Sequence, residues 1–346
     1  MSTQVKTSVI DSDAHVIETE RTWSFMTEEE QAFKPLVLVP KDGSAGTYWL
    51  IEGRAFRSDT NQRDIFPTAA RELSDIKVRL AHMDEMGVDI HVLYPSIFLR
   101  PLSVHPEVDT ALARSYNRWL AEICEQSKGR LRWVMIPPLM QMDAAIAELH
   151  FAKEHGACGV FMRGIERHGR MSDPYIFPLY EEAAKLDMPI TFHAGNGNFD
   201  HYDLHTRDFG FTTFKLPAVG AFHDLIMKGI PEKFPDLRWV FVEVSSQWIP
   251  YAMNDLGIRF RRQDRSFPGK ELLKQNNIYV ACQTADDLDY VFDHVGDDNI
   301  LLGTDYGHND TATELYALRD IGTKSAADAG RIAKILSDNP KRAYSL

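Results

Sequence analysis

The sequence predicts a single (β/α)₈ barrel, and three observations lead to that fold class. Short runs of β-branched and apolar residues alternate with longer stretches of helical periodicity, which is the pattern of βαβ units in a parallel sheet. Eight such units of a strand followed by a helix occur, and eight units fit a closed barrel better than an open sheet. The 346 residues contain no internal repeat, low-complexity tract or linker, so we expect one domain over residues 1–346.

The expected strands follow one another along the whole chain. They are residues 7–13, 88–94, 132–136, 159–162, 189–193, 238–243, 277–281 and 300–304. Amphipathic helices are predicted between them, for example over residues 75–86 and 110–124. In the first of these helices, four apolar side chains lie roughly along one stripe: Ile76, Val78, Leu80 and Met83.

Two stretches interrupt the regular alternation. Residues 21–70 contain three glycines around the segment YWLIEGRAF, which indicates a small inserted hairpin over the mouth of the barrel. Residues 194–220 follow the fifth predicted strand and are rich in glycine, histidine and aromatic residues. A long loop of this composition is typical of a functional lid or a binding loop.

The composition argues against several classes of partner. Lys and Arg number 38 against 50 Asp and Glu, and the formal charge of -12 repels phosphate backbones and anionic lipid head groups. No window approaches the run of about 18 apolar residues that spans a bilayer, and the first residues lack a secretory signal pattern. Three cysteines without a C-x-x-C spacing argue against a disulfide framework. We therefore expect a cytoplasmic protein that binds neither nucleic acid nor membranes.

Four polar side chains are found at the ends of predicted strands. Asp13 and His15, in IDSDAHVIE, are two residues apart at the end of the first strand, so both point to the same face of that strand. His193 ends the fifth strand, and Asp305 directly follows the eighth. Because active-site residues of (β/α)₈ barrels come from the C-terminal ends of strands, we expect these four side chains to converge at the mouth.

Each of these residues also has a structural interpretation when it is taken alone. Asp13 suits a turn, a histidine after an apolar strand is often a core residue with satisfied hydrogen bonds, and Asp305 suits a loop cap. The coincidence of all four at strand ends favours a site for one divalent metal ion. Two imidazoles and two carboxylates suit Zn²⁺ first, and Mn²⁺ or Fe²⁺ as alternatives, whereas calcium prefers oxygen ligands only.

A series of short motifs resembles the amidohydrolase-related family (amidohydrolase family 2), in its branch of metal-dependent decarboxylases of aminocarboxymuconate semialdehyde and of hydroxylated aromatic acids. The motifs occur in the order of that family and cover nearly the whole chain. They are IDSDAHVIE (10–18), RLAHMDEMGVDIHVLYPS (79–96), ITFHAG (190–195), EKFPDLRWVFVEVSSQWIPY (232–251), ILLGTDYGH (300–308) and ILSDNPKRAYSL (335–346).

The resemblance implies a metal-dependent barrel that is usually a homodimer. The ligand pair of the family's first motif, H-x-H or E-x-H, corresponds to Asp13 and His15. The family's histidine after the fifth strand corresponds to His193, and its aspartate after the eighth strand corresponds to Asp305. The resemblance therefore assigns the metal to the same four residues.

One position departs from the decarboxylase branch. That branch has an acid/base histidine at the end of the sixth strand, whereas FVEVSSQW places Glu243 there. The resemblance makes Glu243 a candidate catalytic residue, and the departure weakens the transfer of the branch's reaction to this chain. The alternative is a buried carboxylate paired with an arginine.

Further candidates lie around the same predicted mouth. Arg163 ends the fourth strand and either holds a substrate carboxylate bidentately or pairs with a barrel carboxylate. Tyr94 ends the second strand, and His308 is the leading additional acid/base candidate because it follows Asp305 by three residues. Phe199 and Trp248 are aromatic and suit the walls of a site for a flat ring, although a folded loop also needs its own small core.

Three functions remain open from the sequence. The first is a carboxy-lyase for a small aromatic or unsaturated carboxylic acid, in which Asp305 or Glu243 protonates the carbon that loses CO₂. The second is a hydrolase of an amide, lactone or related bond, in which Glu243 or Asp305 accepts a proton from metal-bound water. The third is a barrel that binds a ligand without catalysis. In each case the partner is a small molecule, and the resemblance favours the first function.

Overall fold

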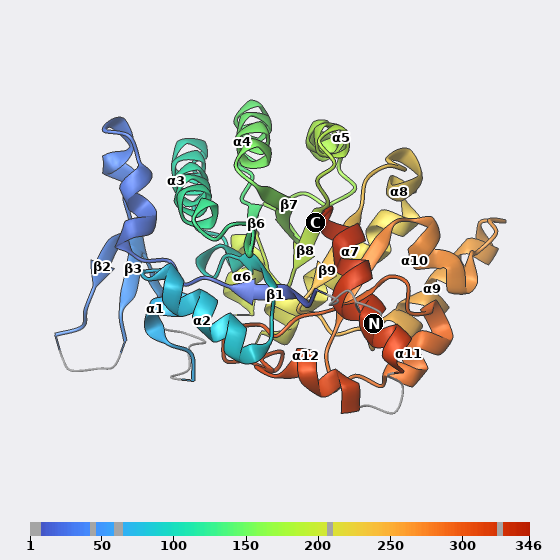
Figure 1. Cartoon of the computed structure of the whole chain (residues 1–346). Helices are drawn as coiled ribbons and strands as arrows, with labels where there is room; N and C mark the ends of the chain where they lie inside the picture. The colour runs from blue at the N-terminus through green and yellow to red at the C-terminus, as the bar shows by residue number, and fades with distance from the viewer. Residues whose placement is uncertain (1–7, 42–45, 59–64, 206–209, 324–327) are drawn as a thin grey trace.

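Eight parallel strands form the centre of the molecule, as predicted. The computed structural model describes residues 8–41, 46–58, 65–205, 210–323 and 328–346. In this part of the chain the strands are hydrogen-bonded in the order β1-β5-β6-β7-β8-β9-β10-β11. Figure 1 labels β1 and β6 to β9 of this sheet, with helices around them. Their bounds are β1 (Ile10–His15), β5 (Ile90–Tyr94), β6 (Leu131–Met135), β7 (Ala157–Arg163), β8 (Ile190–His193), β9 (Trp239–Val242), β10 (Ile278–Cys282) and β11 (Ile300–Leu302). Residue 7, the start of the first predicted strand, lies outside the described residues.

The barrel is closed by contacts between β1 and the segment after β11. The backbone N–H of His15 donates to the carbonyl of Tyr306 at 2.7 Å, and the N–H of Asp305 donates to the carbonyl of Asp13 at 2.9 Å. Gly303 makes this approach possible, because a Cβ atom at that position would lie 2.1 Å from the Cβ of Asp13. The seam therefore brings three predicted ligand or catalytic positions, 13, 15 and 305, side by side.

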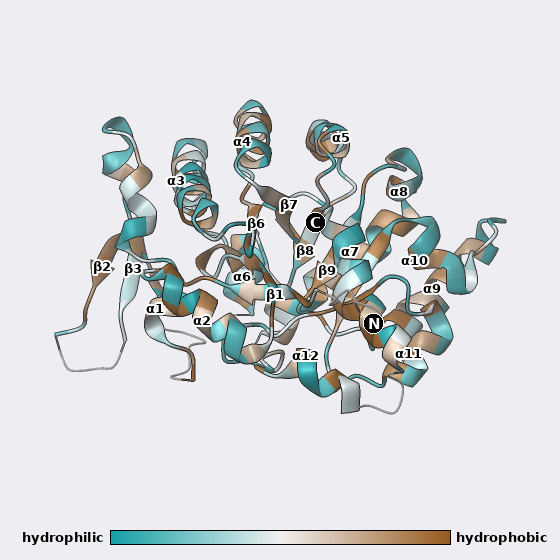
Figure 2. Ribbon diagram, viewed as in Figure 1, coloured by the Kyte–Doolittle hydropathy of each residue, from teal (hydrophilic) through white to brown (hydrophobic). Residues whose placement is uncertain are grey.

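Helices surround the strands and turn their apolar faces inward. The long helices are α2 (Ile76–Met86), α3 (Pro106–Glu125), α4 (Met142–Glu154), α5 (Phe177–Lys185), α7 (Leu216–Met227), α9 (Ile249–Arg262) and α11 (Leu288–Val295). Figure 2 shows apolar strands at the centre and polar outer faces on the helices. The shorter helices are α1 (Thr68–Arg71), α6 (Phe199–Leu204), α8 (Ile230–Lys233), α10 (Leu272–Gln275), α12 (Ala317–Asp320), α13 (Ala329–Ala333) and α14 (Asn339–Tyr344). Among the residues that the structure describes, we find no helix with the length and apolar character needed to cross a bilayer.

The inserted region contains the predicted hairpin and one further strand. β3 (Tyr48–Ile51) and β4 (Arg54–Arg57) are antiparallel, and β2 (Leu36–Leu38) pairs with β3 on its other side. The turn between β3 and β4 has positive φ at Glu52 (47°) and Gly53 (80°), the conformation of a tight hairpin turn. Trp49 of β3 is buried, with its ring 6.0 Å from that of Trp23, and the ring of Trp23 lies 6.3 Å from that of Phe98 after β5, so the insert packs on the barrel.

The stretch 194–220 after β8 is more regular than a loop. It contains α6, a single π-helical turn at Phe211–Lys215 and the beginning of α7. Residues 206–209 lie outside the described residues. The segment keeps its predicted position over the barrel mouth, but a large part of its backbone is bonded within helical turns.

The predicted stripe on helix 75–86 is only partly correct. Met83 is buried, whereas Ile76, Val78 and Leu80 are only partly buried. A charged side chain of α2, Arg79, is as deeply buried as Met83, and both are 0% exposed. Apolar periodicity fails here because the inner face of the helix carries an arginine that bonds polar groups inside the protein.

Replacing Gly303 with alanine tests the closure of the barrel. The added methyl group would force β11 away from Asp13, so we expect Gly303→Ala to destabilise the fold by about 1–3 kcal/mol, as overpacking does. Gly220→Ala is the matched control, because a Cβ there meets nothing within 4 Å on helix α7. Thermal unfolding of both variants is the measurement. Equal melting temperatures for the two variants would contradict this role of Gly303.

Candidate metal centre

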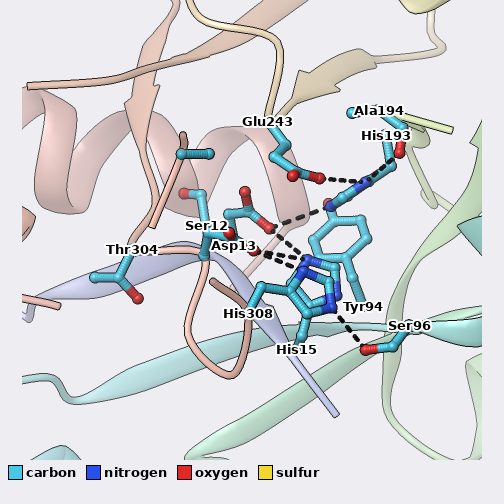
Figure 3. A network of polar contacts seen from close by, with 12 residues as sticks. Ser12, Asp13, His15, Tyr94, Ser96, His193, Ala194, Glu243, Thr304 and His308 are labelled. Atoms are coloured by element: carbon cyan, nitrogen blue, oxygen red, sulfur yellow. Dashed lines mark hydrogen bonds and ion pairs between the residues drawn. The ribbon is translucent and has the colours of Figure 1, made fainter. Parts of the chain in front are cut away.

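Four polar side chains meet at the C-terminal end of the barrel, where the sequence predicts them. Asp13 and His15 lie on β1, His193 ends β8, and Asp305 follows β11. The Nε2 atom of His15 lies 3.4 Å from Oδ1 of Asp13 and 3.3 Å from Oδ1 of Asp305. The Nε2 atom of His193 lies 3.3 Å from the same oxygen of Asp13. Figure 3 shows Asp13 between the rings of His15 and His193. All four side chains are at most 4% exposed.

The two histidines turn their Nε2 atoms inward. The Nδ1–H of His15 donates to the carbonyl of Pro95 at 2.9 Å, and the Nδ1–H of His193 donates to the carbonyl of Ala194 at 3.1 Å. A neutral imidazole with its proton on Nδ1 carries a lone pair on Nε2. Each ring therefore presents a lone pair to the carboxylate oxygens, and backbone carbonyls fix that orientation as they do for metal-binding histidines.

Buried atoms without hydrogen-bond partners support a cation at this point. Nε2 of His15 and Oδ1 of Asp305 are both buried and make no hydrogen bond within the described residues. A buried polar atom without a partner costs free energy, and here lone pairs face one another. A divalent ion would satisfy these atoms at once. Two imidazole nitrogens and two carboxylates are also a donor set for Zn²⁺ or a similar metal, so the residues present fit the group.

The charges of these side chains depend strongly on one another. Burial acts to raise the pKa of the Asp13 carboxyl, but the neighbouring rings of His15 and His193 outweigh it and hold that pKa below its ordinary value. Burial lowers the pKa of His15, so its ring is neutral. Burial, together with the charges of Asp310 and Asp13, raises the pKa of Asp305 well above its ordinary value. The cluster thus lacks positive charge to balance its carboxylates.

Glu243 lies beside the cluster in a backbone conformation that is unusual for a side chain of its size. It follows β9 with φ of 61°, and Asp305 has φ of 50°; strain of this kind is concentrated at functional sites. The Oε2 atom of Glu243 is 3.2 Å from Nδ1 of His193. Burial, then the charges of Asp310 and Asp305, raise the pKa of Glu243 well above its ordinary value. The described residues offer it no arginine partner, which goes against its structural interpretation.

His308 completes the group. Ser96 uses its hydroxyl proton to bond the carbonyl of Val16, so the 2.8 Å contact between Ser96 Oγ and His308 must use the Nε2–H of the ring as donor. The Nδ1 atom of the neutral ring therefore carries a lone pair, 2.9 Å from Oδ1 of Asp305. The ring stacks on that of His15 with 3.7 Å between centroids. Like the other two histidines, His308 turns a lone pair toward the carboxylates.

A cavity of about 740 Å³ lies over this cluster. Glu243 and His308 reach its lining, whereas the four predicted ligands lie beneath its floor. The inserted hairpin and the segment after β8 form two of its walls. The remaining lining residues include Glu18, Trp49, Arg57, Arg100, Tyr202, Phe214, Lys215, Asp310 and Thr311. The arrangement can therefore hold a ligand directly above a buried metal ion.

The sequence can now be compared with known families. The profile of the amidohydrolase family matches residues 10–346, nearly the whole chain. The chain belongs to the amidohydrolase family. The resemblance seen in the short motifs is thereby confirmed.

Individual relatives of this amidohydrolase share its fold at low sequence identity. The 2-amino-3-carboxymuconate-6-semialdehyde decarboxylase of Dictyostelium discoideum is 21% identical over 86% of this chain and 81% of its own. An amidohydrolase structure from Mycobacterium avium subsp. paratuberculosis K-10 has a TM-score of 0.78 at 20% identity, covering 97% of this chain and 98% of its own. The 5-carboxyvanillate decarboxylase of Novosphingobium aromaticivorans, solved with manganese and a nitrobenzoic acid, has a TM-score of 0.70 at 18% identity, covering 99% and 98%.

Two predicted substrate-binding residues of this amidohydrolase lie away from the cavity. The guanidinium group of Arg163 is bonded to both carboxylate oxygens of Glu166, at 2.8 and 2.5 Å, and to the carbonyls of Phe98 and Arg100. These bonds correspond to the alternative of a structural ion pair. Tyr94 is 0% exposed and its hydroxyl bonds that of Tyr344 at 2.8 Å, so the ring lies beneath His193. Both placements go against direct contact with a substrate.

The two predicted aromatic walls are also elsewhere. The ring of Phe199 lies under the guanidinium of Arg54 at 4.3 Å, and neither residue lines the cavity. The indole of Trp248 donates to the carbonyl of Ser245 at 2.7 Å and packs against Phe222. Both side chains pack against other segments and the main hydrophobic core, away from the cavity. The aromatic walls are instead supplied by Trp49, Tyr202 and Phe214.

Several residues of the site carry no clear signal in the sequence. Asp310 ends the segment DYGHND, which begins with Asp305. Its closeness to Asp305 in the sequence was the one signal that could have pointed to it. The carboxylate of Glu18 accepts the N–H groups of Ser96 and Ile97 at 2.9 and 3.0 Å, and it lines the cavity. Lys215 bonds Thr311 at 3.0 Å across the mouth. These contacts join segments far apart in the chain, which periodicity cannot reveal.

A buried network of polar side chains supports β1 on the side away from the cavity. The guanidinium of Arg79 donates to the carbonyl of His15 at 3.1 Å and to Nδ1 of His91 at 3.1 Å. Nε2 of His91 faces Asp11 at 3.4 Å, and Asp11 in turn accepts the backbone N–H groups of Asp13 and Thr304. Burial raises the pKa of Asp11 to about 7. Arg79 thus holds both sides of the seam that carries the ligands.

Removing the charge of Arg79 tests this support. Arg79→Met would leave Nδ1 of His91 and the carbonyl of His15 without their donor, and breaking a buried ion network of this kind costs about 3–5 kcal/mol. Arg170→Met is the control, because the side chain of Arg170 is 77% exposed; surface changes stay within about 0.5 kcal/mol. Urea unfolding measures both. The assignment fails if the two variants unfold at the same urea concentration.

Proposed function

We propose that this amidohydrolase is a metal-dependent carboxy-lyase that removes CO₂ from a small aromatic or unsaturated carboxylic acid. One observation carries the proposal: the carboxyl group of Glu243 is buried at the floor of the cavity, close to the acidic side chains of Asp305 and Asp310. Its raised pKa follows from burial and from the charges of Asp310 and Asp305. A neutral acid beside the reacting carbon is what a protonating decarboxylation needs.

The lining of the cavity suits a flat anion. Arg57, Arg100 and Lys215 bring three positive charges to its walls. The lining also contains the acidic side chains of Glu18, Glu243 and Asp310, so a substrate carboxylate is attracted to the basic part of the wall, where arginine can pair with it through two parallel hydrogen bonds. Trp49, Tyr202 and Phe214 supply ring faces for a planar substrate. The decarboxylases among the relatives, named for a carboxymuconate semialdehyde and for carboxyvanillate, support this substrate class.

The metal ion would be held by Asp13, His15, His193 and Asp305. Zinc is the first candidate for this mixed nitrogen and oxygen set, with manganese or iron as alternatives. The manganese bound in the carboxyvanillate decarboxylase structure supports manganese among these candidates. When bound, the ion supplies a positive charge that polarises a substrate oxygen next to the reacting carbon.

The protein's own residues then account for the movement of the proton. Lys215 or one of the two arginines holds the substrate carboxylate against the cavity wall. Glu243 gives its proton to the carbon that bears this carboxylate. The bond between that carbon and the carboxylate breaks, its electron pair returns to the substrate, and CO₂ leaves. Glu243 takes a new proton from water. Asp305, also predicted as a donor, lies beneath the cavity floor and acts as a ligand, and His308 keeps a lone pair toward it.

The hydrolase alternative places the opposite demand on Glu243. A base that accepts a proton from water must be ionised at the start of the reaction, whereas burial and neighbouring carboxylates favour the protonated form here. The carboxy-lyase is therefore the better supported reaction. The third interpretation, a barrel without catalysis, has no support in a family of enzymes with an intact set of ligands.

The proposal also includes the cellular compartment and the oligomeric state of the enzyme. All three cysteines, Cys124, Cys158 and Cys282, are buried and unbridged, which suits a reducing compartment such as the cytoplasm. A homodimer is proposed from the family resemblance alone. The partner of the site is a small carboxylic acid.

Replacing Glu243 by glutamine tests the proposed proton donor. The amide keeps the size of the side chain but does not protonate carbon, so we expect CO₂ release from an active aromatic acid to fall by about 10²–10⁴-fold. The metal content of the variant serves as its control, since Glu243 is not one of the four ligands. CO₂ release is measured over a panel of aromatic acids, and hydrolysis over amides and lactones.

Two results would overturn the proposal. If the wild type is inactive on every acid of the panel but opens lactones or amides, it is a hydrolase. Alternatively, Glu243→Gln retains the full rate of CO₂ release with a full complement of metal, and another group then donates the proton.

A further inference from the structure

Two walls of the cavity come from segments that are far apart in the sequence. Trp49 and Arg57 reach the lining from the insert, and Tyr202 reaches it from α6. Neither segment belongs to the eight strands of the barrel. Contacts made outside the barrel sheet therefore decide how far apart these two walls lie.

Each wall is attached to a different part of the domain. In the turn before β4, Oε2 of Glu52 accepts the hydroxyl of Ser103, which lies shortly before α3, at 2.5 Å. Immediately before α6, Nδ2 of Asn198 donates to the carbonyl of Arg167, in the segment after β7, at 2.6 Å. These two attachments share no residue, so neither of them holds the insert against α6.

Arg54 joins the two walls directly. Its Nη2 lies 2.5 Å from Oδ1 of Asp203, and its guanidinium carbon lies 4.3 Å from the centre of the Phe199 ring. Phe199 and Asp203 are four residues apart on α6, so both side chains lie on one side of that helix. One arginine of β4 therefore holds α6 at two points, next to Tyr202.

These contacts are made outside the cavity and close to solvent. The side chains of Arg54 and Asp203 are 42% and 49% exposed, and neither residue lines the cavity. Water and salt screen an ion pair at such a position, so it contributes little free energy and breaks readily. The stacking of the guanidinium on Phe199 adds a second weak attraction. Together the contacts favour the joined arrangement without making it permanent.

We propose that Arg54 is a positioning residue that joins α6 to the insert, and that breaking its contacts separates the two walls and opens the cavity for the entry and exit of a ligand. The residue does not touch the ligand. It acts through Asp203 and Phe199, which set the position of Tyr202 relative to Trp49.

The effect on the reaction rests on the proposed function. Glu243 and the four metal ligands belong to barrel strands or follow them closely, so they keep their places when α6 moves. The walls that hold the ring of the substrate do not. We therefore expect Arg54→Met to raise KM by about three- to tenfold, the loss expected for an exposed ion pair and a stacked arginine, and to leave kcat within about twofold.

Hydrogen exchange tests the inference without a substrate. Exchange is measured by mass spectrometry on peptides that cover β4 and α6. We expect the amide hydrogens of residues 199–205 to exchange at least about threefold faster in Arg54→Met than in the wild type, because the helix is released from β4 more often. Arg259→Met is the matched control, because Arg259 is 53% exposed, its Nε lies 2.5 Å from Asp255, and neither residue lines the cavity.

Exchanging the two charges separates a positioning role from substrate binding. The double variant Arg54→Asp with Asp203→Arg restores an ion pair between β4 and α6. We therefore expect slow hydrogen exchange in α6 and the KM for an active acid both to return toward their wild-type values.

The inference is wrong if Arg54→Met leaves the hydrogen exchange of α6 unchanged. It is also wrong if the double variant regains slow exchange but keeps the raised KM, since Arg54 would then bind the substrate itself. An enzyme that releases CO₂ from no acid of the panel contradicts the proposed function instead, and the exchange of α6 still decides the role of Arg54. The two failures are therefore distinct.

Discussion

The central constraint on this structure is a set of imidazole lone pairs and carboxylate oxygens that face one another in the protein interior, beneath the floor of the cavity. His15, His193 and His308 each donate one ring proton outward, to a carbonyl or a hydroxyl, and turn the other nitrogen toward Asp13 or Asp305. Without a cation such a group is unfavourable. The surroundings reflect this constraint, since the β1–β11 seam closes tightly at Gly303 and a buried arginine holds it from below.

The architecture was predictable because its signal is local. Each of the eight strands is a short apolar run before a helix, and β1, β8 and β11 occur where the pattern puts them. The rule that barrel enzymes use the C-terminal ends of strands then selects Asp13, His15, His193 and Asp305. The structure brings these four together. Arg79 is the clearest failure of the pattern, since its partners His15 and His91 come from other elements and its charge hides its burial.

The walls of the cavity were much less predictable. Arg163 ends a strand as an active-site residue should, yet Glu166, three residues later, occupies its guanidinium. Phe199 and Trp248 are aromatic residues in suitable segments, but Phe199 packs under Arg54 and Trp248 packs against Phe222, away from the cavity. The residues that do line the cavity, such as Trp49 and Lys215, come from the insert and from the helical turn before α7. Their positions depend on how separate segments meet, which no short-range pattern records.

The most direct test of the account is metal analysis of the purified protein beside His193→Ala and Asp305→Ala. The account predicts about one tightly bound equivalent of zinc, manganese or iron in the wild type, and its loss in both variants, because each variant removes one of the four ligands. A wild-type protein that holds no metal, even after incubation with these ions, would contradict the assignment of the site and the reaction derived from it.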